Sequence, residues 1–340
     1  MKKKILSTLL MVASIVLLSS CSNEKIKVNP NKETYTVGIT QFVRHVALDA
    51  ATQGFKDSLT NELKAKDRKV KFVETNAQGE VSLCNINATA LLSRNVDLIL
   101  ANATAPFQAV VNATKSVPIL GTSITSYDSA LGINIKDYLI RSNISGTSDL
   151  APLDQQAQMI FDLVDNVKDI GLLYCTAEPN SIYQINKIKD EINKIAKSKN
   201  IEVNISEYGF LESNEAEQIS RLAASKSDVI YVPTDNVVAS CANTIAAATI
   251  KGKNGKRTPI IAGEEGICKG TGIATLSISY YDLGELTGKM ASKVLLGEEN
   301  ISEMKTRFSE KFTKKYNEQF CKEAGIDINK KLDGYEKIGG

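Results

Sequence analysis

Short apolar runs alternate with longer segments of helical spacing through most of the chain. Residues 35–40 form a β-prone run, and residues 47–63 follow it with apolar side chains at helical intervals. The pattern repeats with a strand-like run at 70–75 and a helical segment at 80–93. A regular alternation of strands and helices predicts an α/β fold in which helices cover both faces of a parallel sheet.

One strand, loop and helix unit occurs twice. Asp97 opens an apolar run that ends in a small-residue loop with Thr104, and Asp228 opens one that ends in Thr234-Asp-Asn236. In both copies a helical segment and an X-Pro apolar strand follow, before a loop that starts with Gly. The copies lie about 130 residues apart, which predicts two similar Rossmann-like lobes with parallel sheets. Because ligands of open α/β sheets bind at the carboxyl ends of strands, we also expect a ligand cleft between the lobes.

The remaining pattern divides the chain into segments. We predict that residues 35–147 form lobe 1 and residues 148–276 form lobe 2, with the polar stretch 141–150 as the first crossing. Residues 277–300 are predicted to be a helix that returns to lobe 1. The C-terminal tail, residues 301–340, is predicted to pack near the hinge or on lobe 2.

Two features of the second half bear on packing. Residues 237–250 are compatible with one helix, and the basic insert 251–257 that follows is predicted to be a solvated turn. Gly284 and Gly288 lie one turn apart in the predicted return helix, where the lack of a side chain allows close packing against a neighbouring helix.

The first twenty residues have the pattern of a secretion signal. Three lysines precede an apolar run at 5–18, which is shorter than the roughly 20 residues that a membrane-spanning helix needs. Cys21 directly follows Leu-Ser-Ser, as in a bacterial lipobox, so we predict removal of a lipoprotein signal peptide at 1–20 and lipidation of Cys21. An ordinary signal peptide with a coincidental Cys is the alternative. Polar residues 21–34 are predicted to be a flexible tether, which would leave the protein lipid-anchored to the cell membrane on its extracytoplasmic face.

Charge and cysteine content exclude several classes of function. The chain has 41 Lys and Arg against 39 Asp and Glu, and three of the lysines leave with the signal peptide. The near-neutral body therefore gives no reason to expect a nucleic-acid partner. The five cysteines after Cys21 are widely spaced, no C-x-x-C occurs and His45 is the single histidine, so we expect no metal. These cysteines are predicted to be core thiols, although the sequence leaves a disulfide open.

Common enzyme motifs are absent from the sequence. It contains no G-x-S-x-G, no P-loop and no G-x-G-x-x-G, and we expect neither a catalytic residue nor a cofactor. The neighbouring carboxylates of Glu264 and Glu265 would point apart in a loop, unlike the opposed pair of a glycosidase. His45 has no evident Ser or Cys partner and is predicted to start a helix. A repressor would carry a helix-turn-helix where this chain has its apolar leader.

Seven short motifs occur in order over about residues 35–300. They are Gly38-Ile-Thr-Gln-Phe42, Asn76-Ala-Gln-Gly79, Gly121-Thr122, Gly146-Thr-Ser-Asp149, Tyr231-Val-Pro-Thr-Asp-Asn236, Gly263-Glu-Glu-Gly266 and Tyr281-Asp-Leu-Gly284 to Met290. Together they resemble the motifs of the ABC-transporter substrate-binding lipoproteins that include tryptophan- and tyrosine-binding members, and the pair formed by the fifth and sixth is the most specific. The sequence departs from the family's pattern at the insert 251–257 and at Cys268.

The resemblance implies a type I periplasmic-binding-protein architecture, in which two lobes joined by three crossings close on an aromatic amino acid. We favour tyrosine, then tryptophan or phenylalanine. The implied partners are an ABC permease and its ATPase subunits, and we expect a monomer. A surface lipoprotein that acts mainly in cell or matrix contact (adhesion) is the alternative function.

An amino-acid zwitterion needs donors for its carboxylate and acceptors for its ammonium group. In lobe 1, Thr104 and the amides that start its helix suit an anion, and Thr122 and Ser123 follow the next strand. In lobe 2, Asp235 is our first choice for the ammonium group, with Glu264 and Glu178 behind it. A helix cap is the alternative role for Asp235.

The ligand's ring also needs partners. Phe42 is predicted to stack on it, with a core position as the alternative, and several amides are predicted to contact a phenolic hydroxyl, with solvated loops as the alternative. The full set of predicted ligand-binding residues is Gln41, Phe42, Asn76, Gln78, Ala103, Thr104, Thr122, Ser123, Ser148, Asp149, Glu178, Asn180, Thr234, Asp235, Asn236 and Glu264.

Overall fold

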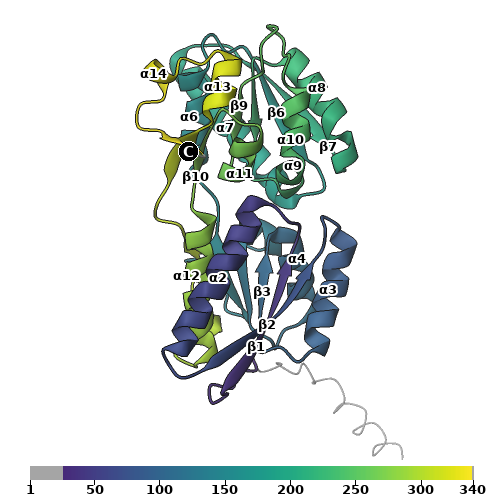
Figure 1. Cartoon of the computed structure of the whole chain (residues 1–340), viewed down its shortest axis with the longest axis vertical. Helices are drawn as coiled ribbons and strands as arrows, with labels where there is room; N and C mark the ends of the chain where they lie inside the picture. The colour runs from purple at the N-terminus through teal and green to yellow at the C-terminus, as the bar shows by residue number, and fades with distance from the viewer. Residues whose placement is uncertain (1–25, 339–340) are drawn as a thin grey trace, which may run out of the picture.

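The computed structural model describes residues 26–338 and has two α/β lobes stacked along its long axis (Figure 1). Lobe one is built on a six-stranded sheet and lobe two on a seven-stranded sheet. The sheet pairings are parallel except that of β10 with β12. The predicted class, an α/β protein with two parallel-sheet lobes, is confirmed. The predicted signal peptide and Cys21 lie outside the described residues.

In lobe one, helices cover both faces of the sheet. The spatial order of strands is β11 (Arg307–Phe308), β5 (Ile144–Ser148), β4 (Ile119–Ile124), β3 (Leu98–Asn102), β1 (Thr34–Gln41) and β2 (Lys69–Asn76). One face packs on α2 (Val46–Lys64) and α12 (Tyr280–Leu295), and the other on α3 (Val81–Ser93), α4 (Thr104–Ala113) and α5 (Tyr127–Leu131). The short turn η2 (Ile301–Glu303) precedes β11.

Lobe two has the same layered design. Its strand order is β13 (Glu336–Lys337), β12 (Thr313–Tyr316), β10 (Ala274–Ser277), β9 (Ile260–Ala262), β8 (Val229–Val232), β6 (Asp169–Cys175) and β7 (Asn204–Phe210). The helices α6 (Leu153–Leu163), α7 (Pro179–Lys199) and α13 (Glu318–Ala324) contribute to the core on one face, and α8 (Ala216–Lys226), α9 (Asn236–Ser240), α10 (Ala242–Ala248) and α11 (Glu265–Gly270) to that on the other. The turn η1 (Ser213–Glu215) and the helix α14 (Ile328–Lys331) complete the lobe.

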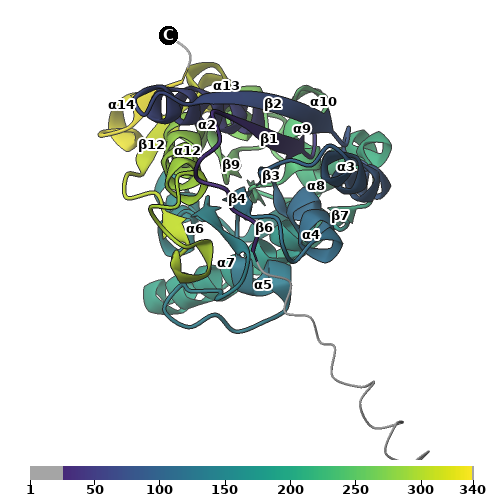
Figure 2. The same ribbon diagram turned by 90° about the horizontal axis from the view of Figure 1, so that it is seen from below.

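The chain passes between the lobes three times. It leaves lobe one after β5, returns between β10 and α12, and crosses again between β11 and β12. Helix α12 therefore packs beside α2 in lobe one, while the last strand, β13, belongs to the sheet of lobe two (Figure 1). Viewed along the long axis, the helices surround the strands of both sheets (Figure 2).

Glycine allows α2 and α12 to touch backbone to backbone. A Cβ atom on Gly284 would lie 2.0 Å from the carbonyl oxygen of Ala51, and one on Gly54 would lie 2.1 Å from that of Tyr281. Both distances are far below a van der Waals contact, so larger residues would force the helices apart. The predicted close packing at Gly284 is confirmed, and it fixes the return helix firmly on lobe one.

Three segments differ from the expected elements. Residues 144–148, within the stretch predicted to be a polar crossing, form the buried strand β5. The helix expected over 237–250 is interrupted at Cys241, which separates α9 from α10. Part of the predicted tether lies against lobe one, where Lys27 donates its backbone N–H to the Ser116 carbonyl at 2.8 Å. The folded body thus includes residues before β1.

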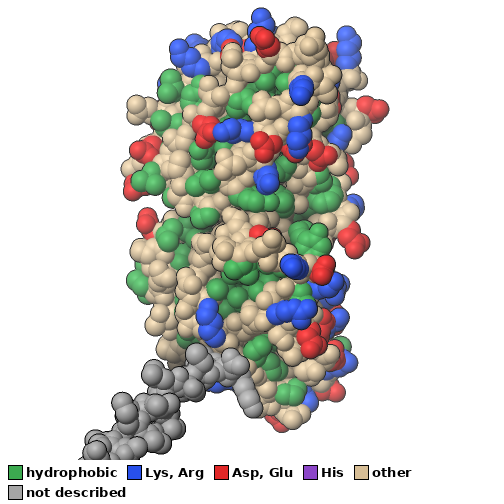
Figure 3. Space-filling model, turned by 180° about the vertical axis from the view of Figure 1, so that it is seen from behind, with side chains coloured by type: hydrophobic (Ala, Val, Ile, Leu, Met, Phe, Trp, Pro, Cys, Tyr) green, Lys and Arg blue, Asp and Glu red, His purple; other side chains and the backbone are tan. Residues whose placement is uncertain are grey.

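Basic and acidic side chains are interspersed on the face drawn in Figure 3, so neither sign of charge dominates that face. Within residues 26–338, no helix has the length and apolar character required to cross a membrane.

Candidate functional site

The loops that follow the strands of lobe one contain unusual backbone conformations. Ala103, after β3, has φ 91°, Ser123, at the end of β4, has φ 56°, and Gln78, after β2, has φ 54°. A side chain with a Cβ atom is strained in this region, at a cost of roughly 1–3 kcal/mol for each residue. Such strain persists where the surrounding structure imposes it, and it concentrates at binding sites.

Polar groups at the same edge of lobe one lack partners. Helix α4 begins after Ala103 without a side-chain cap, which leaves first-turn amides such as that of Thr104 free of a side-chain acceptor. The Ser123 hydroxyl is buried and has no hydrogen-bond partner among the described residues. The N–H of Ala103 donates to the Thr122 carbonyl at 3.1 Å, so the two loops are adjacent. This edge can therefore donate to an anion such as a carboxylate.

Thr122 takes a different orientation from its neighbour. Its hydroxyl accepts a hydrogen bond from Thr147 of β5 at 3.2 Å, and Thr147 also contacts Thr287 of α12 at 2.8 Å. The Thr122 side chain thus lies under α12. Its predicted contact with a ligand stays a prediction.

In lobe two, Asp235 is held by three donors. Its Oδ1 accepts the N–H of Val238 at 2.9 Å and so caps α9, and its Oδ2 accepts Cys175 N–H at 2.7 Å and the Ser181 hydroxyl at 2.8 Å. The capping alternative thus describes the observed contacts. A direct contact between Asp235 and an ammonium group stays a prediction.

Glu178 lies beside Asp235 and organises the start of α9. Its carboxylate accepts the side-chain amides of Asn180 at 3.0 Å and Asn236 at 2.6 Å, and the N–H of Val237 at 2.7 Å. Burial and the charge of Asp235 raise the pKa of Glu178 to about 8. Burial therefore favours the protonated form of Glu178.

The two polar loops of lobe two approach each other through a glycine. A Cβ atom on Gly263 would lie 2.5 Å from the backbone of both Pro233 and Thr234. Glu264, the next residue, caps α11 by accepting the N–H groups of Gly266 and Ile267. Burial raises the pKa of Glu264 to about 7 despite these donors. Glu264 and Thr234 therefore lie in one cluster.

A further buried carboxylate lies where the lobes join. Asp149 accepts the hydroxyls of Thr125 at 3.2 Å and Tyr280 at 2.9 Å, and burial raises the pKa of its carboxyl. Ser148 donates to the Thr125 carbonyl at 3.1 Å. The first two crossings are thus hydrogen-bonded to each other through Asp149.

Gln184 of α7 links the two halves of the site and was absent from the predicted set. Its amide donates to the Thr125 hydroxyl of lobe one at 3.3 Å and also to the Thr234 hydroxyl, while its oxygen accepts Thr234 N–H at 3.2 Å. It lies within a helical pattern rather than after a strand, so no local pattern marks it. Thr125 and Tyr280 were also absent from the predicted set, although Thr125 directly follows β4 and Tyr280 begins α12.

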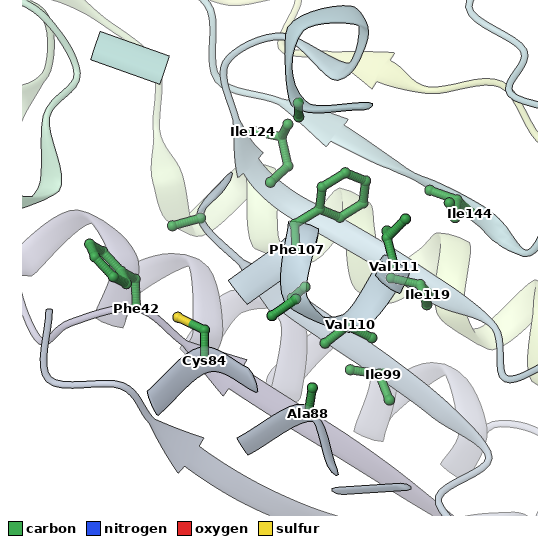
Figure 4. Packing of buried hydrophobic residues seen from close by; sticks show 14 of the residues in the cluster. Phe42, Cys84, Ala88, Ile99, Phe107, Val110, Val111, Ile119, Ile124 and Ile144 are labelled. Atoms are coloured by element: carbon green, nitrogen blue, oxygen red, sulfur yellow. The ribbon is translucent and has the colours of Figure 1, made fainter. Parts of the chain in front are cut away.

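The residues predicted to contact the ligand's ring lie in different environments of the structure. Gln41 is engaged inside lobe one by Asp49 at 2.7 Å and Thr52 at 2.7 Å. Phe42 is buried in the lobe-one core beside Cys84 (Figure 4). The structure thus gives Phe42 the core contacts that were its alternative role.

Asn76 ends the edge strand β2 and Gln78 follows it, and the Asn76 side chain accepts the N–H of Gln78 at 2.8 Å. Asn180 instead belongs to the lobe-two cluster and donates to the Thr234 carbonyl at 3.0 Å. Contact of any of these residues with a ligand stays a prediction.

The structure has two α/β lobes with three crossings, and polar loops meet at the carboxyl ends of both sheets. These features define a two-lobe binding protein of the type I periplasmic-binding-protein class. The chain belongs to the ABC transporter substrate binding protein family, whose model matches residues 36–336.

Three similar proteins illustrate the relationship. A tyrosine-binding protein from Clostridioides difficile (strain R20291) is 34% identical over 310 residues, which cover 87% of this chain and 85% of the relative. The ABC domain from Streptococcus pneumonia in complex with L-Trp is 29% identical and has a TM-score of 0.81, with 89% of this chain and 99% of that chain covered. The ligand-free, open structure of a substrate-binding protein with adhesive properties from Clostridium difficile is 31% identical, with the same coverage and a TM-score of 0.64.

Proposed function

We propose that this protein captures an aromatic amino acid, with tyrosine favoured, for an ABC importer. The observation that carries the proposal is the complementary chemistry of the two lobes. Lobe one holds the uncapped start of α4 and the Ser123 hydroxyl, which has no partner among the described residues, while buried carboxyl groups lie where the lobes join, at Asp149, and in lobe two, at Glu264. Such a pair of surfaces matches the carboxylate and the ammonium group of a zwitterion.

The comparisons support this class of ligand. One relative with 34% identity is named for tyrosine binding, and the similar streptococcal domain was solved with L-Trp. Both ligands are amino acids with a large aromatic side chain, which gains affinity by leaving water for a closed cleft. In this proposal the protein binds its ligand without transforming it and passes it to a permease.

The proposed location is the outer face of the cell membrane, with a lipid on Cys21 as the anchor. The support is the lipobox-like pattern before Cys21. Replacement of Cys21 with Ser should move the protein from the membrane fraction to the soluble fraction of lysed cells. Retention of the variant in the membrane fraction would contradict the lipid anchor.

A contribution to adhesion is the second candidate function. It is favoured by the 31% identical substrate-binding protein with adhesive properties. Beads coated with the protein should then attach to cultured cells more often than beads coated with an unrelated lipoprotein. Equal attachment would remove this candidate.

The test of the principal proposal is a thermal-melt screen of the protein, first freed of bound ligand, against the twenty amino acids. A ligand that binds only the folded state stabilises it by about 2.7 kcal/mol at a hundredfold excess over its dissociation constant. We expect a rise in melting temperature with tyrosine, and smaller rises with tryptophan or phenylalanine. No rise with any amino acid would overturn the proposal.

A further inference from the structure

The single histidine of the chain lies at the junction of the two lobes. His45 immediately precedes α2 of lobe one, and its Nε2 lies 3.1 Å from Oδ1 of Asn236, the first residue of α9 in lobe two. Its side chain does not cap α2. The ring therefore makes a contact between lobes instead of a contact that serves its own helix.

Glu178 fixes the direction of this hydrogen bond. Because the Asn236 Nδ2 group donates to Glu178 at 2.6 Å, the Asn236 oxygen is the atom that faces His45. An amide oxygen can only accept, so the proton of the neutral ring lies on Nε2, which donates. The other ring nitrogen, Nδ1, is buried and has no partner among the residues of the described part of the chain.

The same end of α9 also makes an apolar contact across the junction. Val237 packs against the buried core cluster of lobe one and against that of lobe two. It follows Asn236 directly, and its N–H donates to Glu178 at 2.7 Å. Glu178 thus fixes the start of α9, which carries both the polar contact of Asn236 and the apolar contact of Val237. Helix α9 lies on the side of lobe two that faces lobe one (Figure 1).

The arrangement of the lobes resembles that of a ligand complex. The chain has a TM-score of 0.81 against the streptococcal domain with L-Trp and 0.64 against the open, ligand-free protein, although the two identities are 29% and 31%. A hydrogen bond between His45 and Asn236 requires the lobes to be together. Opening would return the ring of His45 to water.

A second proton on His45 would oppose this closed arrangement. It would reside on the buried Nδ1, which has no acceptor, and burial lowers the pKa of His45 although the Asn236 contact and the Asp49 carboxylate act in the other direction. Burial and the nearby Asp235 raise the pKa of Glu178, which reduces the opposite charge that Glu178 presents to the ring. Other charged side chains on the elements at this junction include Arg44 before α2, Asp235 at the cap of α9, and Glu264 at the cap and Glu265 in the first turn of α11, a helix that contacts α2.

We propose that His45, Asn236 and Glu178 form an inter-lobe latch, so that protonation of His45 weakens ligand capture by favouring the open state. The proposal rests on the proposed function, because it requires that a ligand closes the lobes. In the open state the ring has an ordinary pKa near 6.5, and closure lowers the pKa. The closed state is therefore favoured above pH 6.5 and loses stability as the pH falls below it. By linkage, ligand binding must lower the pKa of His45 by the same free energy.

The test uses the fact that one histidine gives one set of ring signals. The pH titration of His45 is followed by NMR in the ligand-free protein and in the protein saturated with L-tyrosine, which stays a zwitterion between pH 5 and 7.5. We expect the midpoint to move to lower pH on binding. Isothermal titration calorimetry of L-tyrosine should show at least about a fivefold loss of affinity from pH 7.5 to 5.0, the lower end of typical couplings.

Two variants separate the latch from other titrating groups. In His45→Gln the side chain can still donate to Asn236 but does not titrate, so the loss of affinity towards pH 5.0 should shrink to the part due to Glu178 and Glu264. The matched control is Val46→Ala, an exposed neighbour at the first position of α2, which should keep the wild-type pH profile. Equal His45 midpoints with and without L-tyrosine, or equal pH profiles for wild type and His45→Gln, would overturn the latch while leaving ligand binding intact. Absence of L-tyrosine binding at every pH, with no other amino acid bound, would overturn the proposed function and the latch together.

Discussion

The two copies of the duplicated unit agree at one end of their strands and differ at the other. At the amino end of β3, Asp97 accepts the N–H of Thr36 at 2.8 Å, and at the amino end of β8, Asp228 accepts that of Asp169 at 2.9 Å. Each aspartate also pairs with a lysine. The two residues do the same structural work of joining neighbouring strands in each lobe.

At the carboxyl ends of the strands, the two copies differ in how their polar groups are hydrogen-bonded. In lobe one the loops consist of small residues. The Ser123 hydroxyl and the side-chain oxygen of Asn102 have no partner among the described residues. In lobe two, by contrast, Asp235 and Glu178 are occupied by donors from their own lobe. Lobe one thus has polar groups that remain available to hydrogen-bond another molecule, whereas the polar groups of lobe two mostly bond to its own loops. Variants should therefore affect binding in lobe one and folding in lobe two.

The largest expected effect comes from Asp235→Ala. The change removes the α9 cap and leaves the Cys175 N–H and the Ser181 hydroxyl without their acceptor. We expect the free energy of unfolding of the ligand-free protein to fall by about 3 kcal/mol. Urea denaturation measures it. Unchanged stability together with lost binding would show that lobe two also reserves its carboxylate for the ligand, which would end the contrast between the lobes.

The second-largest expected effect is a dependence of stability on pH, which follows from the raised pKa values of the buried carboxyl groups of lobe two. The pKa values of Glu178 and Glu264 are about 8 and about 7, against 4.5 for an ordinary glutamate. A carboxyl whose pKa is raised by folding stabilises the native state below pH 4.5, and this contribution is lost as the pH rises through the folded-state value. We expect at least about 2 kcal/mol less stability at pH 8 than at pH 5.5.

Denaturation at both pH values checks this expectation. Glu178→Gln should reduce the dependence to the part due to Glu264, since its amide stays neutral. The control Glu217→Gln, on the exposed face of α8, should leave the dependence as in the wild type. If wild type and Glu178→Gln lose equal stability, the Glu178 carboxyl is charged in the folded protein and the pH argument fails.

The order of the regular elements could be predicted because it depends on local pattern. Apolar runs and helical spacing identify β1, β2, β6 and most helices, and the glycines at 284 and 288 predict a close helix contact. Strand β5 could not be predicted in this way, since Ile144 is its one large apolar residue. Its polar groups are satisfied by distant partners, such as Met304 for Ser145. Tertiary contacts here override the local pattern.

The candidate site was predictable where a polar residue follows a strand, and less so elsewhere. Glu178, Asp235 and Glu264 were identified from their places in loops, but the sequence could not tell whether their oxygens are free or already bonded. Gln184 reaches the site from a helix, and its role depends on the approach of the two lobes. Such contacts depend on the arrangement of elements in space, which a single sequence does not record.

The smallest expected effect tests the lobe-one side of the contrast. Ser123→Ala removes a buried hydroxyl that has no partner among the described residues, so the ligand-free protein should keep its free energy of unfolding within about 0.5 kcal/mol. If the hydroxyl donates to the ligand's carboxylate, the affinity for L-tyrosine should fall about tenfold, or about 1.4 kcal/mol.

The matched control is Ser220→Ala, because the Ser220 hydroxyl is also buried and without a partner in the described chain, but it lies in α8 of lobe two. Calorimetry should show wild-type affinity for Ser220→Ala and the loss for Ser123→Ala alone. Equal affinities in both variants would mean that an unpartnered hydroxyl is merely a defect of packing in either lobe. Lobe one would then hold no reserved donor at Ser123, and the carboxylate would have to bind at the start of α4 alone.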